Sequence, residues 1–197
     1  MAAPPLPKLA SPLAPLLPRL ALEGEPAAVL TGVQTAAEGV ERLVAKGFCN
    51  EAARLAAHAL PRREAVWWAC MCAIAVPDPA LPPADAAARE AAEAWVRKPT
   101  EDALRRAAWD AAQKTEFASP EAWAAVGAFW SGGSMSPEGQ PVVPPADHLT
   151  GVAVSGAVVM AAVRGRPERA QARLLRFLDA ARDIAGGGAG RIAPEEN

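Results

Sequence analysis

The sequence predicts an all-α protein, and three observations indicate it. Alanine, the best helix former and a poor strand former, supplies 49 of the 197 residues. Tyrosine is absent and phenylalanine occurs only four times, so aromatic strand formers are scarce. Hydrophobic residues make up 51% and charged residues 21% of the chain, as in folded globular proteins. We therefore expect an irregular bundle of seven or eight helices around a central apolar helix at about 146–164.

Residues 1–25 are expected to form a proline-rich arm ahead of the helical domain. Seven prolines within the first 26 residues would break a regular helix and a secretory signal segment alike. Leucines recur along the arm, so we expect it to lie against the helical body or in a groove of a partner. The domain itself is expected over 26–185, followed by a flexible glycine-rich tail at 186–197.

Glycine and proline divide the first half of the helical domain. One or two helices are expected over 26–47, because Gly47 follows a basic last turn and suits the position just after a helix. A further helix is expected at about 49–60. Pro61 then suits the first residue of a helix over 61–76, where proline loses no hydrogen bond.

Charge pairs mark the next two helices, which follow a proline-rich connector. The segment 85–98 carries Asp85 and Arg89 four residues apart, as neighbours on one helix face. Glu101 and Arg105 repeat this spacing after Pro99, which indicates a new helix from that point.

The last third of the domain is expected to hold three helices and one long loop. Ser119 is a suitable N-cap for a helix that ends at about 131. Glycine and proline predict a loop over 131–145, followed by the apolar helix at 146–164. Apolar residues at helical spacing then predict an amphipathic helix from Pro167 to about 185.

The apolar helix is expected to be a core helix. Its uncharged stretch runs for 15 residues, from Leu149 to Val163. A transmembrane helix needs about 20 apolar residues, and shorter stretches are more often buried core helices. We expect no membrane span.

The charge balance and the number of cysteines limit the partners and the location that this protein can have. Twenty Lys and Arg residues oppose 22 Asp and Glu residues, which gives a net charge of −2. A dedicated nucleic-acid-binding protein would be strongly basic, so we expect no nucleic acid partner. Three cysteines are an odd number, which favours a reducing, cytoplasmic location over a disulfide scaffold.

A zinc site is the sharpest metal hypothesis, and helical geometry weakens it. Its candidate ligands are Cys49, His58, Cys70 and Cys72. At about 100° per residue, Cys70 and Cys72 point about 200° apart on a helix and cannot share one ion. We expect no metal and no cofactor.

A small helical hydrolase is the enzymatic alternative. Ser134 and His148 would be its nucleophile and base, with Asp147 beside the histidine. An aspartate that adjoins the histidine is poorly placed to orient the ring, and the chain has no Gly-x-Ser-x-Gly motif. We therefore expect no enzyme and no catalytic residue.

Two groups of residues are candidate partner-binding sites. Trp123 and Trp130 lie seven residues apart, hence on one helix face, where they would form a core stripe or a groove for a partner or ligand. Arg169, Arg173 and Arg176 share one face of the last helix, opposite its apolar stripe. Residues 164–178 hold five arginines and one glutamate, a net charge of +4, which is typical of a solvated face or of a site for an acidic partner.

Three segments of the chain resemble a family of uncharacterised bacterial proteins. They are WWACMCAI (67–74), SPEAWAAVGAFWSGGSMSP (119–137) and PPADHLTGVAVSGAVVMAA (144–162). Family members share a Trp-Trp-Ala-Cys helix and a tryptophan helix that runs into a Ser-Gly-Gly-Ser loop. The family has no assigned function, so the resemblance implies no catalytic residue. Its genes occur near type VI secretion clusters, which implies an accessory role there.

The sequence thus predicts a non-enzymatic adaptor that binds another protein, with a secretion-system component as the partner that the resemblance implies. A helical hydrolase and a bundle that binds a ligand on its tryptophan face remain the alternatives.

Overall fold

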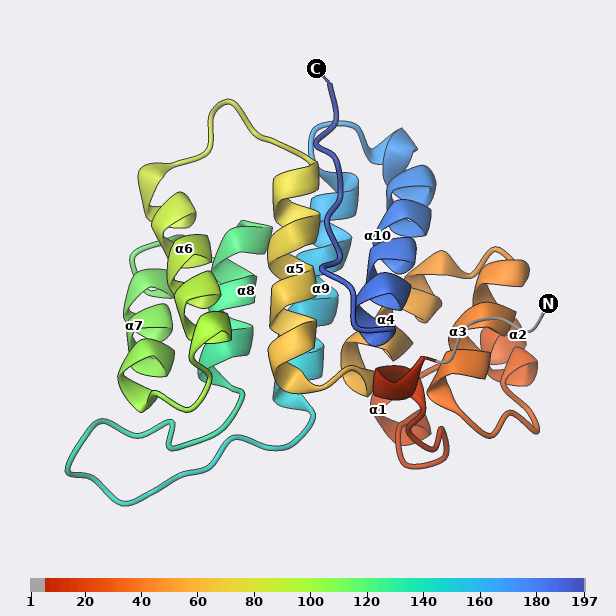
Figure 1. The fold of residues 1–197 in the computed structure, drawn as a ribbon, viewed down its shortest axis with the longest axis horizontal. Helices are drawn as coiled ribbons and strands as arrows, with labels where there is room; N and C mark the ends of the chain where they lie inside the picture. Colours follow the sequence, from red (N-terminus) through yellow and green to blue (C-terminus); the bar gives the residue numbers. More distant parts are fainter. Residues whose placement is uncertain (1–5, 197) are drawn as a thin grey trace.

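The computed structural model describes residues 6–196, and within them the protein is an all-α bundle (Figure 1). Backbone pairing between extended segments in this range is limited to one isolated bridge between Pro12 and Thr35. The helices are α1 (Leu17–Leu20), α2 (Gly24–Val29), α3 (Ala36–Ala45), α4 (Cys49–Ala59), α5 (Arg62–Ala75), α6 (Pro83–Arg97), α7 (Asp102–Ala112), α8 (Pro120–Phe129), α9 (Leu149–Val163) and α10 (Ala170–Ala185), with 3₁₀ turns η1 (Pro7–Leu9) and η2 (Pro167–Arg169). The prediction of an all-α bundle is confirmed.

Helix α9 is the centre of this bundle. It packs against α4, α5, α8 and α10, so most of its surface is covered by other helices. Small residues on α9, such as Ala153, Ala157 and Ala161, are fully buried and allow these close approaches. Within the described part of the chain, no single helix is both long and apolar enough to cross a membrane. The helix pair Leu149–Val163 and Pro167–Ala185 reaches that length and hydropathy only when its two members are taken together, and they are bent by 113° relative to each other.

The described residues hold ten α-helices where seven or eight were expected. The short α1 lies in the proline-rich arm, for which no helix was expected, and α2 begins in that arm and runs into 26–47, for which one or two helices were expected. Pro18 and Pro26 lie at the second and third positions of these helices. The first four N–H groups of a helix have no intrahelical acceptor, so proline there removes no hydrogen bond.

The N-terminal leucines are part of the core. Leu9, Leu13 and Leu20 are fully buried, and Leu16 is nearly so. Arg54 of α4 donates a hydrogen bond to the carbonyl oxygen of Leu20, which ties α1 to the bundle. Residues 6–22 therefore form two helical turns that pack on α4 and are not an extended chain.

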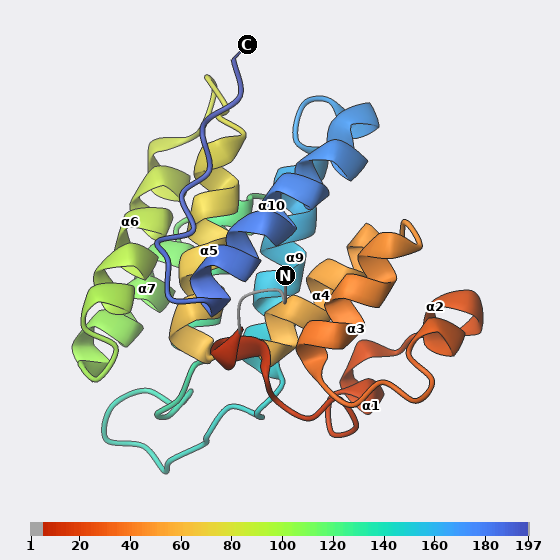
Figure 2. The same ribbon diagram turned by 45° about the vertical axis from the view of Figure 1, so that its right-hand side comes forward.

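The C-terminal segment departs from the expected flexible tail. After α10 the chain reverses and runs back between α5 and α10, as Figures 1 and 2 both show. Gly187 and Gly190 have positive φ angles, which glycine adopts without strain, so they allow the reversal. We refer to residues 186–196 as the tail; its contacts with α5 and α10 are described below.

Candidate functional site

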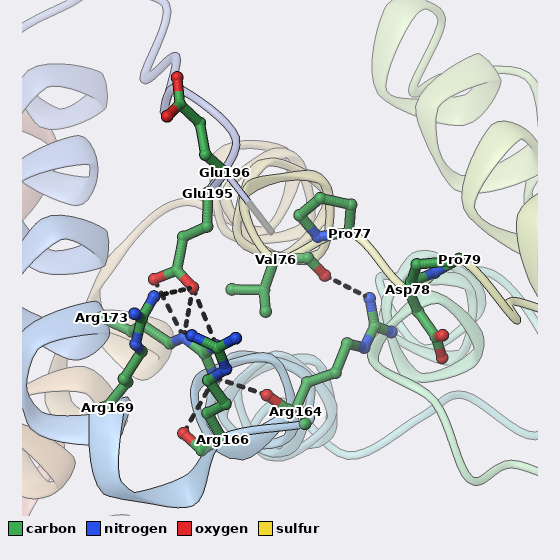
Figure 3. A pocket seen from close by; sticks show the side chains of 11 residues that line it. Val76, Pro77, Asp78, Pro79, Arg164, Arg166, Arg169, Arg173, Glu195 and Glu196 are labelled. Carbon is green, nitrogen blue, oxygen red and sulfur yellow. Dashed lines mark hydrogen bonds and ion pairs between the residues drawn. The ribbon is translucent and has the colours of Figure 1, made fainter.

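The candidate site is a cavity of about 220 Å³ at the end of the bundle where α5 and α9 finish and α10 begins (Figure 3). We call it the arginine pocket. Four arginines line it, together with the connector after α5 and the end of the tail. The arginines are Arg164, Arg166, Arg169 and Arg173. The tail contributes Glu195, whose carboxylate points toward Arg169 and Arg173 in Figure 3.

Arg173 is the best-fixed cation of the pocket. It lies in the first turns of α10 and is only 3% exposed. Its Nη1 donates to three backbone carbonyls at the end of α9 and beyond, those of Ala162 at 2.9 Å, Arg164 at 2.6 Å and Arg166 at 3.3 Å. Its other edge donates to Glu195, with Nη2 2.9 Å from Oε2 and Nε 3.1 Å from Oε1. Arg173 is therefore a preorganised receptor for a carboxylate.

Two further arginines complete the ring of positive charge around Glu195. Nη1 of Arg169 lies 3.6 Å from Oε2, and Nη1 of Arg176 lies 3.4 Å from Oε1. The hydrogen bond from Arg173 lowers the pKa of Glu195 below its usual value despite desolvation, and the charges of the three arginines add to this. Three guanidinium groups thus share one carboxylate.

Arg164 forms a wall of the pocket and has a different role. Its side chain points away from Glu195 (Figure 3), and its Nη1 donates to the carbonyl oxygen of Val76 at 2.9 Å and to Oε1 of Glu121 at 3.0 Å. Glu121 is only 2% exposed, so this is a buried ion pair. It joins the ends of α5 and α9 to the start of α8 and so fixes the pocket's walls.

The structure brings together the three arginines that the sequence selected, but their environment differs from the expectation. Arg169, Arg173 and Arg176 were placed on one face opposite the apolar stripe of α10. Arg173 is instead buried, because the end of α9 and the tail cover that side of the helix. Glu195, the group that they bind, was not among the predicted site residues. The only signal for it was the opposite charge of the Glu195-Glu196 pair in the tail.

The two candidate tryptophans lie together on α8 and at its end. Trp123 and Trp130 are half-buried, and their rings meet edge to face with centroids 6.3 Å apart. Nε1 of Trp123 donates to the carbonyl oxygen of Phe117 at 2.9 Å. Both rings pack against the core, and a partner role for them stays a prediction.

The residues of the hydrolase alternative lie in the loop that joins α8 to α9. The hydroxyl oxygen of Ser134 accepts hydrogen bonds from the backbone N–H groups of Ser136 and Val143, each at 3.1 Å. His148 is exposed at the start of α9. The bonds that Ser134 accepts favour a role in shaping the loop, whose carbonyl groups Arg105 and Arg106 also hold.

All three cysteines are free and buried within the helices. Burial raises the pKa of Cys49, Cys70 and Cys72, so their thiols stay protonated near neutral pH. Among residues 6–196, no three His, Cys, Asp or Glu side chains are grouped closely enough to hold a metal ion.

His58 predicts a pH dependence of stability. Its ring packs against Gly151 of α9, where a Cβ would overlap the ring, and burial together with the nearby Arg19 lowers its pKa to about 4. The unfolded chain, with a histidine pKa of about 6.5, then binds more protons between these two values. Stability should therefore fall as the pH drops from about 6.5 to 4.

We expect this loss to be about 1–2 kcal/mol, after allowance for solvent screening of a partly exposed ring. Urea unfolding at pH 7, 5.5 and 4 measures it. The variant His58→Gln should flatten the dependence in this window; an unchanged slope in the variant would assign the effect to other groups.

The fold and the pocket define the class of protein. It is an α-helical bundle in which arginines at one end hold a carboxylate. The chain belongs to the Family of unknown function (DUF6931), whose model matches residues 39–185. The resemblance to an uncharacterised family is thereby confirmed. The match includes Arg169, Arg173 and Arg176 and ends before Glu195. No curated protein and no solved structure matches the chain.

Proposed function

We propose that this protein is a non-enzymatic interaction module that binds an acidic, extended segment of a partner protein in its arginine pocket. The observation that carries the proposal is the convergence of Arg169, Arg173 and Arg176 on the single carboxylate of Glu195. Arginine forks match carboxylate geometry, and a receptor held in advance loses little entropy on binding.

The exposure of the three arginines supports a site that a second molecule can reach. Arg173 is buried and fixed, whereas the side chains of Arg169 and Arg176 are 44% and 39% exposed. The one carboxylate of Glu195 is shared by three guanidinium groups, and the other acidic residues that line the pocket, Asp78 and Glu196, form no ion pair with the trio within the described part of the chain. An acidic segment would therefore meet one rigid receptor and two accessible cations that steer it.

The resemblance supports a more specific setting for this module. A cytoplasmic adaptor of a type VI secretion system is the role that the gene neighbourhood of similar proteins implies. The partner would then be a secretion component with an acidic segment. The chemistry of the pocket can be tested without knowing that partner.

The test uses a full-length chain in which the occupant is weakened. Glu195→Gln removes the charge of the bound side chain and keeps its size. We expect this variant to bind a fluorescein-labelled synthetic peptide with the sequence of residues 190–197, GRIAPEEN, as measured by fluorescence anisotropy. Added Arg169→Glu and Arg176→Glu substitutions should weaken binding by about tenfold or more, because they reverse two of the three charges.

The control carries a charge reversal at a distance. Arg97→Glu changes an exposed arginine of α6, outside the pocket, and should leave the affinity for the peptide unchanged. Binding should also weaken as salt is added. Absence of peptide binding by the Glu195→Gln chain, or equal binding after reversal of Arg169 and Arg176, would refute the proposed function.

A further inference from the structure

We infer that the tail is an internal competitor for the partner. The partner segment would bind in place of the tail, on the residues of α5 and α10 that contact it, with an aliphatic side chain three residues before its glutamate. This inference rests on the proposed function and adds to it the regulation and the sequence pattern of the ligand. It is carried by the path of the tail, which is held by contacts at residues 188–190, 192, 193 and 195.

Three hydrogen bonds hold the start of the tail in place. The amide of Gly188 donates to the carbonyl oxygen of Asp183 at 2.7 Å, and the amide of Gly190 donates to Oδ2 of the same residue at 2.7 Å. From the other side, Nε1 of Trp67 on α5 donates to the carbonyl oxygen of Ala189 at 2.8 Å. Residues of both α5 and α10 therefore bind the backbone of the tail.

The same pattern continues toward the arginine pocket. Nη2 of Arg176 donates to the carbonyl oxygen of Ala193 at 2.5 Å, and the amide of Glu195 donates to the carbonyl oxygen of Ala75 at 2.9 Å. The backbone contacts at residues 193 and 195 do not depend on the side chains there, whereas Gly188 and Gly190 leave no room for a Cβ. Two side chains give the tail its specificity, namely Ile192, half-buried against the core, and Glu195 in the pocket.

This division of contacts defines the ligand. Backbone hydrogen bonds supply affinity for an extended chain and two side-chain positions supply selectivity, the same division of roles as when an extended peptide adds to the edge of a sheet. Ile192 and Glu195 are three residues apart, so the ligand pattern is an aliphatic residue, two variable residues and a glutamate. The commitment to an acidic protein segment follows from the charge of the pocket.

The contacts also make the tail displaceable. Ala193, Pro194 and Glu196 are exposed, and two of the three ion pairs of Glu195 involve half-exposed arginines. A tethered segment has an effective concentration in the millimolar range, so even a weakly bound tail blocks a free peptide. A tail with an intrinsic dissociation constant of about 100 μM would weaken binding of that peptide by about tenfold.

The experiment compares the affinity of the labelled GRIAPEEN peptide for four full-length chains. Wild type should bind weakly. Glu195→Gln should bind about tenfold more tightly, because its tail has lost the pocket contact. Glu196→Gln is the matched control: it makes the same charge change one residue further on, at an exposed side chain, and should bind like wild type.

A second variant releases the tail without touching the pocket. Gly190 has a φ of +62°, and a Cβ there would overlap Ile184 of α10. Valine suits neither the backbone angle nor the space, so Gly190→Val should detach the tail and leave its glutamate and the arginines intact. It should match the tighter binding of Glu195→Gln.

The ligand pattern is tested on the peptide. Replacing its isoleucine with serine, or its first glutamate with glutamine, should weaken binding to the Glu195→Gln chain by about tenfold, and alanine-to-serine replacement should not. Equal affinity of wild type and both released chains, or no effect of the isoleucine, would overturn the inference while the proposed function stands.

The oligomeric state separates a partner from a second copy of this chain. We expect wild type to be monomeric by light scattering at the concentrations of the binding assay. A concentration-dependent dimer that disappears in Glu195→Gln would assign these contacts to the tail of a second copy and overturn the assignment to a partner protein.

Discussion

Arg173→Ala should lower the free energy of unfolding by about 3 kcal/mol and release the tail. The substitution removes the donor of three backbone carbonyls at the end of α9, which are then left without that partner. It also removes the two-point contact to Glu195, so the tail loses its main anchor in the pocket. Urea unfolding gives the stability change, and hydrogen exchange of the tail amides reports its release.

Arg169→Ala is the matched control for this prediction. It removes the same charge from the same trio, but its side chain is 44% exposed and its contact with Glu195 is longer. Exposed pairs contribute at most about 1 kcal/mol, so the stability change should be small. Equal losses for the two variants would contradict the view that Arg173 is the preorganised member of the trio.

Glu121→Ala should cost about 3 kcal/mol as well, by leaving a buried cation without its partner. Glu121 binds Arg164 with both oxygens, and Arg164 in turn donates to the end of α5. The carbonyl oxygen of Arg164 also accepts from Arg173, so the pair lies directly beneath the pocket. We therefore expect Glu121→Ala to loosen the tail in addition to destabilising the fold.

The comparison for this prediction is Glu168→Ala, which removes an exposed acid from the turn η2. It should change stability by less than about 0.5 kcal/mol. Thermal unfolding of both variants at pH 7 measures the difference. A loss below about 1 kcal/mol for Glu121→Ala would show that the buried pair does not hold the walls of the pocket.

The helices were predictable where local signals were strong. The serine before α8 accepts a hydrogen bond from Ala122, as an N-cap should, and Gly47 follows α3 with a positive φ. The apolar segment at 146–164 becomes the central helix α9 because its small residues allow four other helices to pack closely against it. Such signals reside within a few residues and need no tertiary information.

The pocket was predictable only in part, because its pieces are far apart in the sequence. The spacing of Arg169, Arg173 and Arg176 along the sequence predicted that they share one helix face, because that depends only on local geometry. The burial of Arg173 depends on the end of α9 and on Glu195, 22 residues further on. Glycine content likewise suggested a flexible tail, whereas a contact across 122 residues, from Trp67 to Ala189, fixes it in place.

A crystal structure of the Glu195→Gln chain with the GRIAPEEN peptide tests the central claim most directly. The account predicts a peptide carboxylate within hydrogen-bonding distance of Nε and Nη2 of Arg173, with the peptide backbone along α5 and the chain's own tail displaced. A peptide bound elsewhere, or a pocket in which the glutamine of the chain's own tail stays against Arg173 at saturating peptide, would contradict it.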